Sequence, residues 1–200
     1  FFSFTLSDIG YLGMVFAYVI DFQTGEYKEE TIAVPFASGV KLPRNSTQGI
    51  SEYKKGGISL QFEVKENTRE LTIHWPGFGG TALNAELSFA CPPEHESMNI
   101  AIPIPNKRFY YNRKINCMPA RGWVEYQNER FEIHPETCLG NLDWGRGVWE
   151  YDSFWVWASA SGFLSDKRRF GLNLGFGFGD TSAATENCFI LDGKIHKLVE

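Results

Sequence analysis

The residues best suited to chemistry gather in residues 142–162. This segment holds four of the six tryptophans of the chain, together with Asp143 and Arg146. A carboxyl group at the mouth of an apolar cavity is desolvated, which raises its pKa and lets it donate a proton. An arginine beside it acts in the opposite direction and keeps the carboxylate ionised. Asp143 is therefore a candidate acid, or else one half of an ion pair with Arg146 that pins a glycine-flanked turn at residues 143–147.

A second candidate acid, Glu186, follows a glycine-rich stretch. Apolar residues alternate with Asn173 and three glycines over residues 172–179. Glycine inside a strand often marks close approach by a ligand or by another backbone, although indoles from a neighbouring strand would fill the same space. The spacing G-x-G-x-G lacks the G-x-G-x-x-G pattern and the helix that a dinucleotide site requires.

The tryptophan-rich segment itself predicts a strand. From Phe154 onward a period of two places Trp155, Trp157, Ser159 and Ser161 on one face, and the opposite face is also apolar. We therefore expect this strand to be buried on both sides. Indoles beside small hydroxyl groups are typical of a ligand pocket. A packed core, in which indole N–H groups and serine hydroxyls satisfy one another, explains the same residues, so both interpretations stay open.

These patterns give two sets of candidate site residues. The candidate catalytic residues are Asp143 and Glu186. The candidate ligand-binding residues are Trp144, Arg146, Trp149, Trp155, Trp157, Ser159, Asn173 and Asn187. We expect no metal site, because Cys91 and His95 lack the further ligands of a zinc centre, and no cofactor. No nucleophile motif of the G-x-S-x-G type is present.

The elements that must position these residues are strands. Apolar and polar residues alternate over 58–64 and 71–75, on either side of a polar turn at 65–69, which predicts a β-hairpin. Further strand-like stretches are 14–22, 86–90, 98–104, 109–117, 123–126 and 130–133. Residues 44–57 indicate a polar surface loop, and residues 181–187 are the one segment that suggests a short helix. The sequence therefore predicts an all-β, antiparallel sandwich or barrel.

Composition excludes several classes of function. Aromatic residues make up 16% of the chain, which favours strands, and the net charge is -5. Without a basic patch, a nucleic-acid partner is disfavoured. No apolar run approaches the roughly 18 residues of a transmembrane helix. The four cysteines form no C-x-x-C pair, which favours free thiols in a reducing compartment such as the cytoplasm. The oligomeric state is not indicated.

Five short motifs resemble those of a known family. They are KINCMPA at 114–120, LDWGRGVW at 142–149, WASASG at 157–162, GLNLG at 171–175 and TEN at 185–187. In order and spacing over residues 1–200 they resemble the domain of unknown function 2804 family. The resemblance implies a longer chain, with strands before Phe1 and after Glu200, which agrees with strand-like sequence at both ends. It assigns no catalytic residue.

More distantly, the sequence is similar to the lipocalin-like group of carotenoid hydratases, tocopherol cyclases and fungal Diels–Alderases. That similarity implies a lipocalin-like (calycin-like) barrel or strongly curved sheets in a two-barrel architecture that encloses apolar substrates. Residues 1–200 then form one lipocalin-like region, with one barrel ending near residue 105 and a second starting near residue 106. Asp143 and Trp144 fall about where that group has an Asp-His pair, so the missing histidine counts against hydratase chemistry.

Three functions are compatible with these features. The first is binding of an apolar small molecule, lipid-like or isoprenoid-like, in an aromatic-lined barrel cavity. The second is a cofactor-free hydratase, isomerase or cyclase, in which Asp143 or Glu186 acts as the acid and indole faces stabilise a cation. The third is a structural or interaction module with a filled core. Binding is favoured because no acid and base pair stands out. An enzyme requires a carboxyl group that faces the cavity without a neutralising partner.

Overall fold

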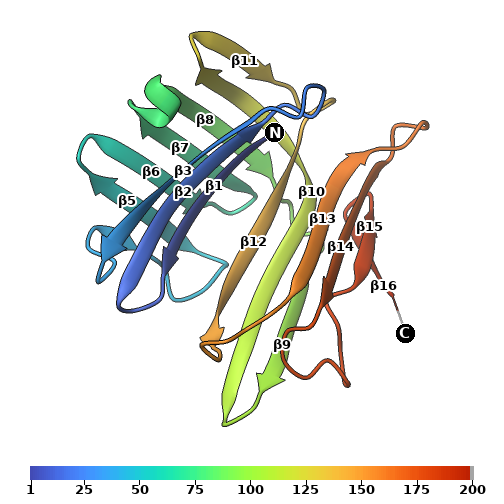
Figure 1. The fold of residues 1–200 in the computed structure, drawn as a ribbon. Coiled ribbons are helices and arrows are strands. Elements are labelled where there is room, and N and C mark those ends of the chain that lie inside the picture. Colours follow the sequence, from blue (N-terminus) through green and yellow to red (C-terminus); the bar gives the residue numbers. More distant parts are fainter. Residues whose placement is uncertain (199–200) are drawn as a thin grey trace. The chain divides into compact units, whose positions relative to one another are not determined.

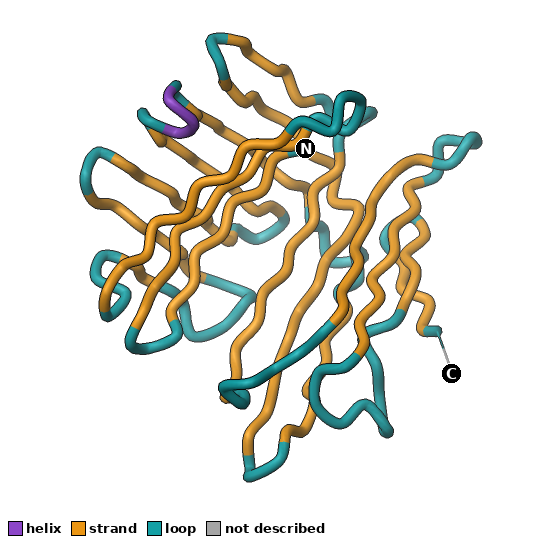
Figure 2. The backbone as a smooth tube through the Cα atoms, viewed as in Figure 1, coloured by secondary structure: helices purple, strands orange, loops and turns teal. Residues whose placement is uncertain are grey.

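A computed structural model describes residues 1–198 as an all-β protein whose paired strands run antiparallel. Strand and loop make up nearly all of the backbone in Figure 2. Within the described residues the one helical element is a 3-10 turn, η1 (Phe78–Gly80). The predicted antiparallel all-β class is confirmed. The strand-like end predicted at Glu200 lies outside the described residues.

The chain divides into two compact units. Unit 1 comprises Phe1–Ser88 and Arg121–Ile133, and unit 2 comprises Phe89–Ala120 and the chain from His134 onward. A single long strand, β10 (Arg108–Tyr126), gives its first part to unit 2 and its last part to unit 1. The predicted division near residue 105 concerns closed barrels and stays a prediction, because each described sheet has an open strand order.

Unit 1 contains a three-stranded sheet in the order β1-β2-β3 and the sheet path β11-β10-β8-β7-β6-β5-β4 (Figure 1). Its strands are β1 (Phe2–Asp8), β2 (Leu12–Ile20), β3 (Tyr27–Pro35), β4 (Val40–Lys41), β5 (Gly49–Lys55), β6 (Ile58–Val64), β7 (Thr68–Trp75), β8 (Leu83–Ala90) and β11 (Glu129–Ile133). The predicted hairpin is confirmed as β6 and β7, with Leu60 opposite Ile73 in the core.

The predicted polar loop at 44–57 is wrong over β5. This strand pairs with β6 on one side and with the two-residue β4 on the other. Tyr53 is its buried side chain, whereas its lysines are exposed. A strand so close to a sheet edge carries polar residues that limit unwanted pairing, and its composition therefore resembles that of a loop.

Unit 2 contains the strands that carry the candidate site. In one sheet β10 pairs with β9 and with β12, and a second sheet has the order β13-β14-β15-β16 (Figure 1). The strands are β9 (Met98–Ile104), β12 (Leu139–Val148), β13 (Val156–Phe163), β14 (Arg169–Phe176), β15 (Cys188–Leu191) and β16 (Lys194–Lys197). The predicted helix at 181–187 is wrong, because this segment is irregular. There the Thr185 hydroxyl accepts a hydrogen bond from the backbone N–H of Asn187, a local alternative to helix.

The two sheets of unit 2 contact each other through one face each. An apolar cluster joins β9 to β15 and includes Ile100 and Ile190. On the side of β13 the contacts are polar, because Asn116 of β10 donates from Nδ2 to the Ser159 hydroxyl at 2.8 Å. The interior of unit 2 therefore changes from apolar to polar across the sheets.

A β-bulge in β10 shapes this interior. The register against β12 shifts between Ile115 and Met118, and Cys117 has a φ of 62°, in the left-handed region. Consecutive side chains in a regular strand point to opposite faces. Here the side chains of Asn116 and Cys117 both face the four-stranded sheet, since Asn116 Nδ2 bonds the Ser159 hydroxyl and Cys117 Sγ lies 3.5 Å from the Ser161 hydroxyl. The bulge therefore places one additional residue in the interior.

Two further features are plain from the described residues. The four cysteines, Cys91, Cys117, Cys138 and Cys188, are free thiols. Across residues 1–198 no helix has the length and apolar character needed to cross a membrane.

Candidate functional site

A buried lysine lies at the centre of the candidate site. Lys114 of β10 has a side chain that is only 4% exposed. Its Nζ lies 3.0 Å from Oδ2 of Asp143 on β12 and 3.2 Å from Oε2 of Glu186, which precedes β15. The Asp143 side chain is 42% exposed and the Glu186 side chain 12%. We call these three residues the charge triad, and both predicted catalytic carboxyl groups belong to it.

Neutral polar groups hold the charge triad in place. Asn112 donates from Nδ2 to Oδ1 of Asp143 at 2.7 Å. Asn173 is fully buried, donates from Nδ2 to Oε2 of Glu186 at 3.1 Å and accepts a hydrogen bond from the Trp157 indole at 2.8 Å. The Trp157 ring also covers the lysine ammonium, with 4.4 Å between Nζ and the ring centroid. This is the geometry of a cation–π contact.

A group of aromatic side chains adjoins the charge triad. Phe178 is at its centre, with ring centroids 4.8 Å from Tyr110, 6.0 Å from Trp149 and 5.3 Å from Trp155, all in edge-to-face geometry. We call these four residues the aromatic cluster. Trp149 is 40% exposed and Trp155 is 56% exposed, so the cluster presents two indoles to solvent. Large exposed apolar groups that lie together are typical of binding surfaces.

Tyr110 connects the aromatic cluster to the charge triad. Its ring packs on Phe178, and its hydroxyl is hydrogen-bonded to the same Asn112 Nδ2 that bonds Asp143. Burial raises the pKa of the Tyr110 hydroxyl, and the nearby carboxylates of Asp143 and Glu186 raise it further. The phenol therefore stays protonated at physiological pH, with negative charge close by.

The glycines of β14 make room for side chains of this chain. A Cβ on Gly175 would collide with the carboxylate of Glu186, and a Cβ on Gly171 would lie 2.6 Å from Sγ of Cys117. The sequence predicts that a ligand, another backbone or indoles from a neighbouring strand fill the space beside the glycines of residues 172–179. At Gly175 the occupant is instead the Glu186 carboxylate, whereas a Cβ on Gly179 would lie 2.8 Å from the Pro103 carbonyl oxygen, so another backbone does approach there.

The predicted turn at 143–147 is wrong, because these residues lie inside β12. Gly145 and Gly147 permit β12 to approach β10 closely: a Cβ on Gly145 would lie 3.2 Å from Asn112 Nδ2, and one on Gly147 would collide with the Phe109 carbonyl. Glycines that suggest a turn in the sequence therefore serve strand packing. Asp143 and Arg146 are three residues apart in a strand, so their side chains point to opposite faces.

The prediction that the tryptophan strand is buried on both sides is also wrong. Val156 is 57% and Trp157 43% exposed, and Ala158 is exposed as well. The physical reason is that β13 pairs only with β14 and forms the edge of its sheet. The predicted alternation itself holds, because Trp157, Ser159 and Ser161 all contact β10 or Asn173.

The model of the family described as domain of unknown function (DUF2804) matches residues 1–200. The chain belongs to the DUF2804 family. Searches of curated proteins and of solved structures each found no match.

The five motifs that carry the resemblance to the family meet at the charge triad. The motif at 114–120 supplies the lysine and 142–149 the aspartate, while 185–187 supplies the glutamate. The motif at 157–162 contributes the indole over the lysine, and 171–175 contributes Asn173. The residues that hold this candidate site together therefore come from five separate stretches of the chain.

Sequence reasoning missed three residues of this candidate site, Tyr110, Asn112 and Lys114. They alternate along β10, so they share one face of the strand. A lysine on the same strand face as Tyr110 and Asn112 was the available signal. It was obscured because Tyr111 and Arg113 give the opposite face an equally polar pattern.

Three other predicted residues differ in their position relative to the triad. Trp144 belongs to the face of β12 opposite Asp143, and its ring lies 5.9 Å from that of Tyr111. Arg146 shares that face by its place in the strand and is exposed. Asn187 accepts a hydrogen bond from the Gly175 backbone at 2.7 Å, which fixes the segment that carries Glu186 against β14. The structure therefore brings Asn187 to the site and directs Trp144 away from it.

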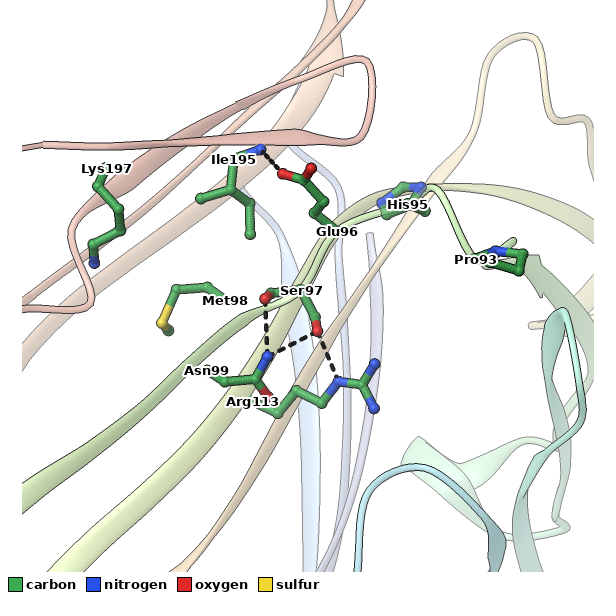
Figure 3. Close-up of a pocket in the computed structure, with 9 residues that line it drawn as sticks. All are labelled: Pro93, His95, Glu96, Ser97, Met98, Asn99, Arg113, Ile195 and Lys197. Atoms are coloured by element: carbon green, nitrogen blue, oxygen red, sulfur yellow. Dashed lines mark hydrogen bonds between the residues drawn. The ribbon is translucent and has the colours of Figure 1, made fainter.

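A hollow of unit 2 lies elsewhere. It has a volume of about 520 Å³ and is lined by the segment before β9 and by residues of β9, β10 and β16, including Ser97, Arg113 and Lys197 (Figure 3). Figure 3 shows the Ser97 hydroxyl accepting hydrogen bonds from Arg113 Nε and Asn99 Nδ2, each at 3.0 Å. None of the predicted site residues lines this hollow. Within residues 1–198, no three His, Cys, Asp or Glu side chains gather in a way that would hold a metal ion.

Proposed function

We propose that unit 2 binds an apolar small molecule on its aromatic cluster, with the charge triad at the polar end of the ligand. The observation that carries this proposal is the position of Tyr110. Its ring belongs to the aromatic cluster and its hydroxyl bonds the amide that also bonds Asp143. Apolar surface with a few placed polar groups is the usual composition of a small-molecule site.

Exposure supports the same proposal. Trp149, Trp155 and Trp157 are between 40% and 56% exposed, and Asp143 is 42% exposed beside them. A ligand that covers the indoles would remove large apolar areas from water, at roughly 25 cal/mol per Å² of buried apolar surface. We take the lipocalin-like, two-barrel architecture as part of this proposal, since it would surround such a ligand with further strands.

Proton-transfer chemistry is the second candidate. Asp143 and Glu186 each lie within 3.2 Å of the Lys114 ammonium. A carboxylate held in such an ion pair is poorly suited to donate a proton, so a cofactor-free hydratase, isomerase or cyclase ranks below simple binding. The third candidate, an interaction module with a filled interior, is favoured by the polar contacts that satisfy the serines of β13.

Native mass spectrometry tests the proposal directly. The protein is purified without detergent, its mass is measured, and any bound molecule is extracted into organic solvent and identified. We expect an apolar adduct. Trp155→Ser should lose it, whereas Tyr27→Ser should keep it, because Tyr27 is an exposed aromatic residue of unit 1. A protein that stays free of adducts after incubation with lipids and isoprenoids would refute binding and favour the interaction module.

A further inference from the structure

The polar end of the proposed site contains mainly hydrogen-bond acceptors. The lysine of the charge triad carries one positive charge and the two carboxylates carry two negative charges, which leaves a net charge of minus one. The positive charge is the buried part, since Lys114 is 4% exposed and Asp143 42%. A ligand that reaches the triad from solvent therefore meets a carboxylate first.

A second acceptor lies beside this carboxylate. Asn112 is fully buried, and both of its Nδ2 hydrogen bonds are used, to Asp143 and to the Tyr110 hydroxyl. Its Oδ1 has no hydrogen-bond partner among the described residues. A buried acceptor without a donor costs about 1 to 3 kcal/mol, so a donor brought to this point is favourable. The orientation of the amide is fixed, because the Asp143 carboxylate needs the N–H group.

We infer that the ligand carries a hydrogen-bond donor at its polar end, an ammonium or a hydroxyl group, and that a carboxylate end is rejected. This inference rests on the proposed function and names the class of ligand. The donor lies against Asp143 and the apolar body extends along Tyr110 and Phe178 to the exposed indoles. Net negative charge favours a cation and opposes an anion, because like charges brought together in a partly desolvated site repel.

Nearby charges do not cancel this preference. Arg108 is paired with Glu150 at 3.1 Å, next to Trp149, so this pair adds little net charge. Arg146 has its own interactions and belongs to the opposite face of β12 from Asp143. Burial raises the pKa of Tyr110, with Asp143 and Glu186 adding to the effect, which agrees with a negative potential at the junction of cluster and triad.

Three probes with one chain length test the inference. Decylamine, 1-decanol and sodium decanoate are titrated into the full chain by isothermal titration calorimetry at neutral pH. We expect decylamine to bind at least about tenfold more tightly than decanoate, a difference of about 1.4 kcal/mol, with decanol between them. Raising the salt concentration should weaken the binding of decylamine and leave the binding of decanol unchanged.

A charge-matched pair of variants completes the test. Asp143→Asn should reduce the preference for amine over acid to less than about threefold, whereas Asp166→Asn, in the exposed turn between β13 and β14, should leave it unchanged. If decanoate binds the wild type as tightly as decylamine, the inference is wrong while the proposed function stands. If none of the three probes binds, the proposed function itself fails. If Asp143→Asn does not fold, the salt dependence of binding is the test. The inference is wrong if salt weakens the binding of decylamine no more than that of decanol.

Discussion

Removing the charge of Lys114 should destabilise unit 2 strongly. Lys114→Met keeps the length of the side chain but leaves two carboxylates without their cation. Breaking a buried ion pair by removing one partner costs about 3 to 5 kcal/mol, because the remaining charge is desolvated and unpaired. Most of this loss arises at Glu186, because its side chain is only 12% exposed. The Asp143 side chain is 42% exposed, so water can hydrate its carboxylate once the lysine charge is gone. We therefore expect a loss near the lower limit, about 3 kcal/mol in the free energy of unfolding.

A second variant separates the ion pair from simple packing. In Lys114→Met/Glu186→Gln the buried negative charge is also gone, and the amide still accepts a hydrogen bond from Asn173. We expect this double variant to recover at least about 2 kcal/mol of the loss, which is a coupling typical of groups in direct contact. If packing of the lysine stem alone mattered, the double variant would be no more stable than the single one.

Urea unfolding followed by tryptophan fluorescence is a suitable assay. Trp144, Trp149, Trp155 and Trp157 lie in unit 2, whereas Trp75 and Trp123 lie in unit 1, so the signal reports mainly on the site. A loss below about 1 kcal/mol for Lys114→Met would mean that the lysine is not the buried partner of both carboxylates. That result would refute the reasoning.

Other predictions concern single residues. Burial lowers the pKa of His95 below its ordinary value of 6.5, so the stability that this residue contributes is present above pH 6.5 and lost as the pH falls below it. His95→Gln should flatten that part of the stability curve. Cys117 and Cys188 are fully buried with raised thiol pKa values, so a thiol reagent should label them only after unfolding, as peptide mapping would show. Gly122→Ala should cost more than about 2 kcal/mol by thermal or urea unfolding, because φ is +128° and a Cβ meets backbone, whereas Gly77→Ala, with open space, should be nearly neutral.

More of the fold than of the candidate site could be predicted from the sequence. Period-two alternation is a local property, so the hairpin of β6 and β7 and most other strands follow from it. The glycines of β12 led to the wrong prediction of a turn at 143–147, because Gly145 and Gly147 are compatible with a turn as well as with close strand packing. The polar composition of β5 resembles that of a loop, so the sequence did not predict this strand next to a sheet edge.

The candidate site depends on contacts that no local pattern contains. Asp143 and Glu186 could be selected because they flank unusual segments. Their common partner Lys114 could not, because it meets them only when β10, β12 and the segment before β15 come together. The exposure of Trp157 likewise depends on the place of β13 at a sheet edge, which is a property of the strand order and is absent from its own residues.

The bulge in β10 has a consequence for how relatives of this chain can vary. Because it turns Asn116 and Cys117 to the same side, Asn116 contacts Ser159 while Cys117 contacts Ser161 and fills the space over Gly171. A larger residue at 117 has no room unless its surroundings change. We therefore expect positions 116 and 117 to covary with 159, 161 and 171 across the family, so that homologues lacking the bulge would also lack the glycine.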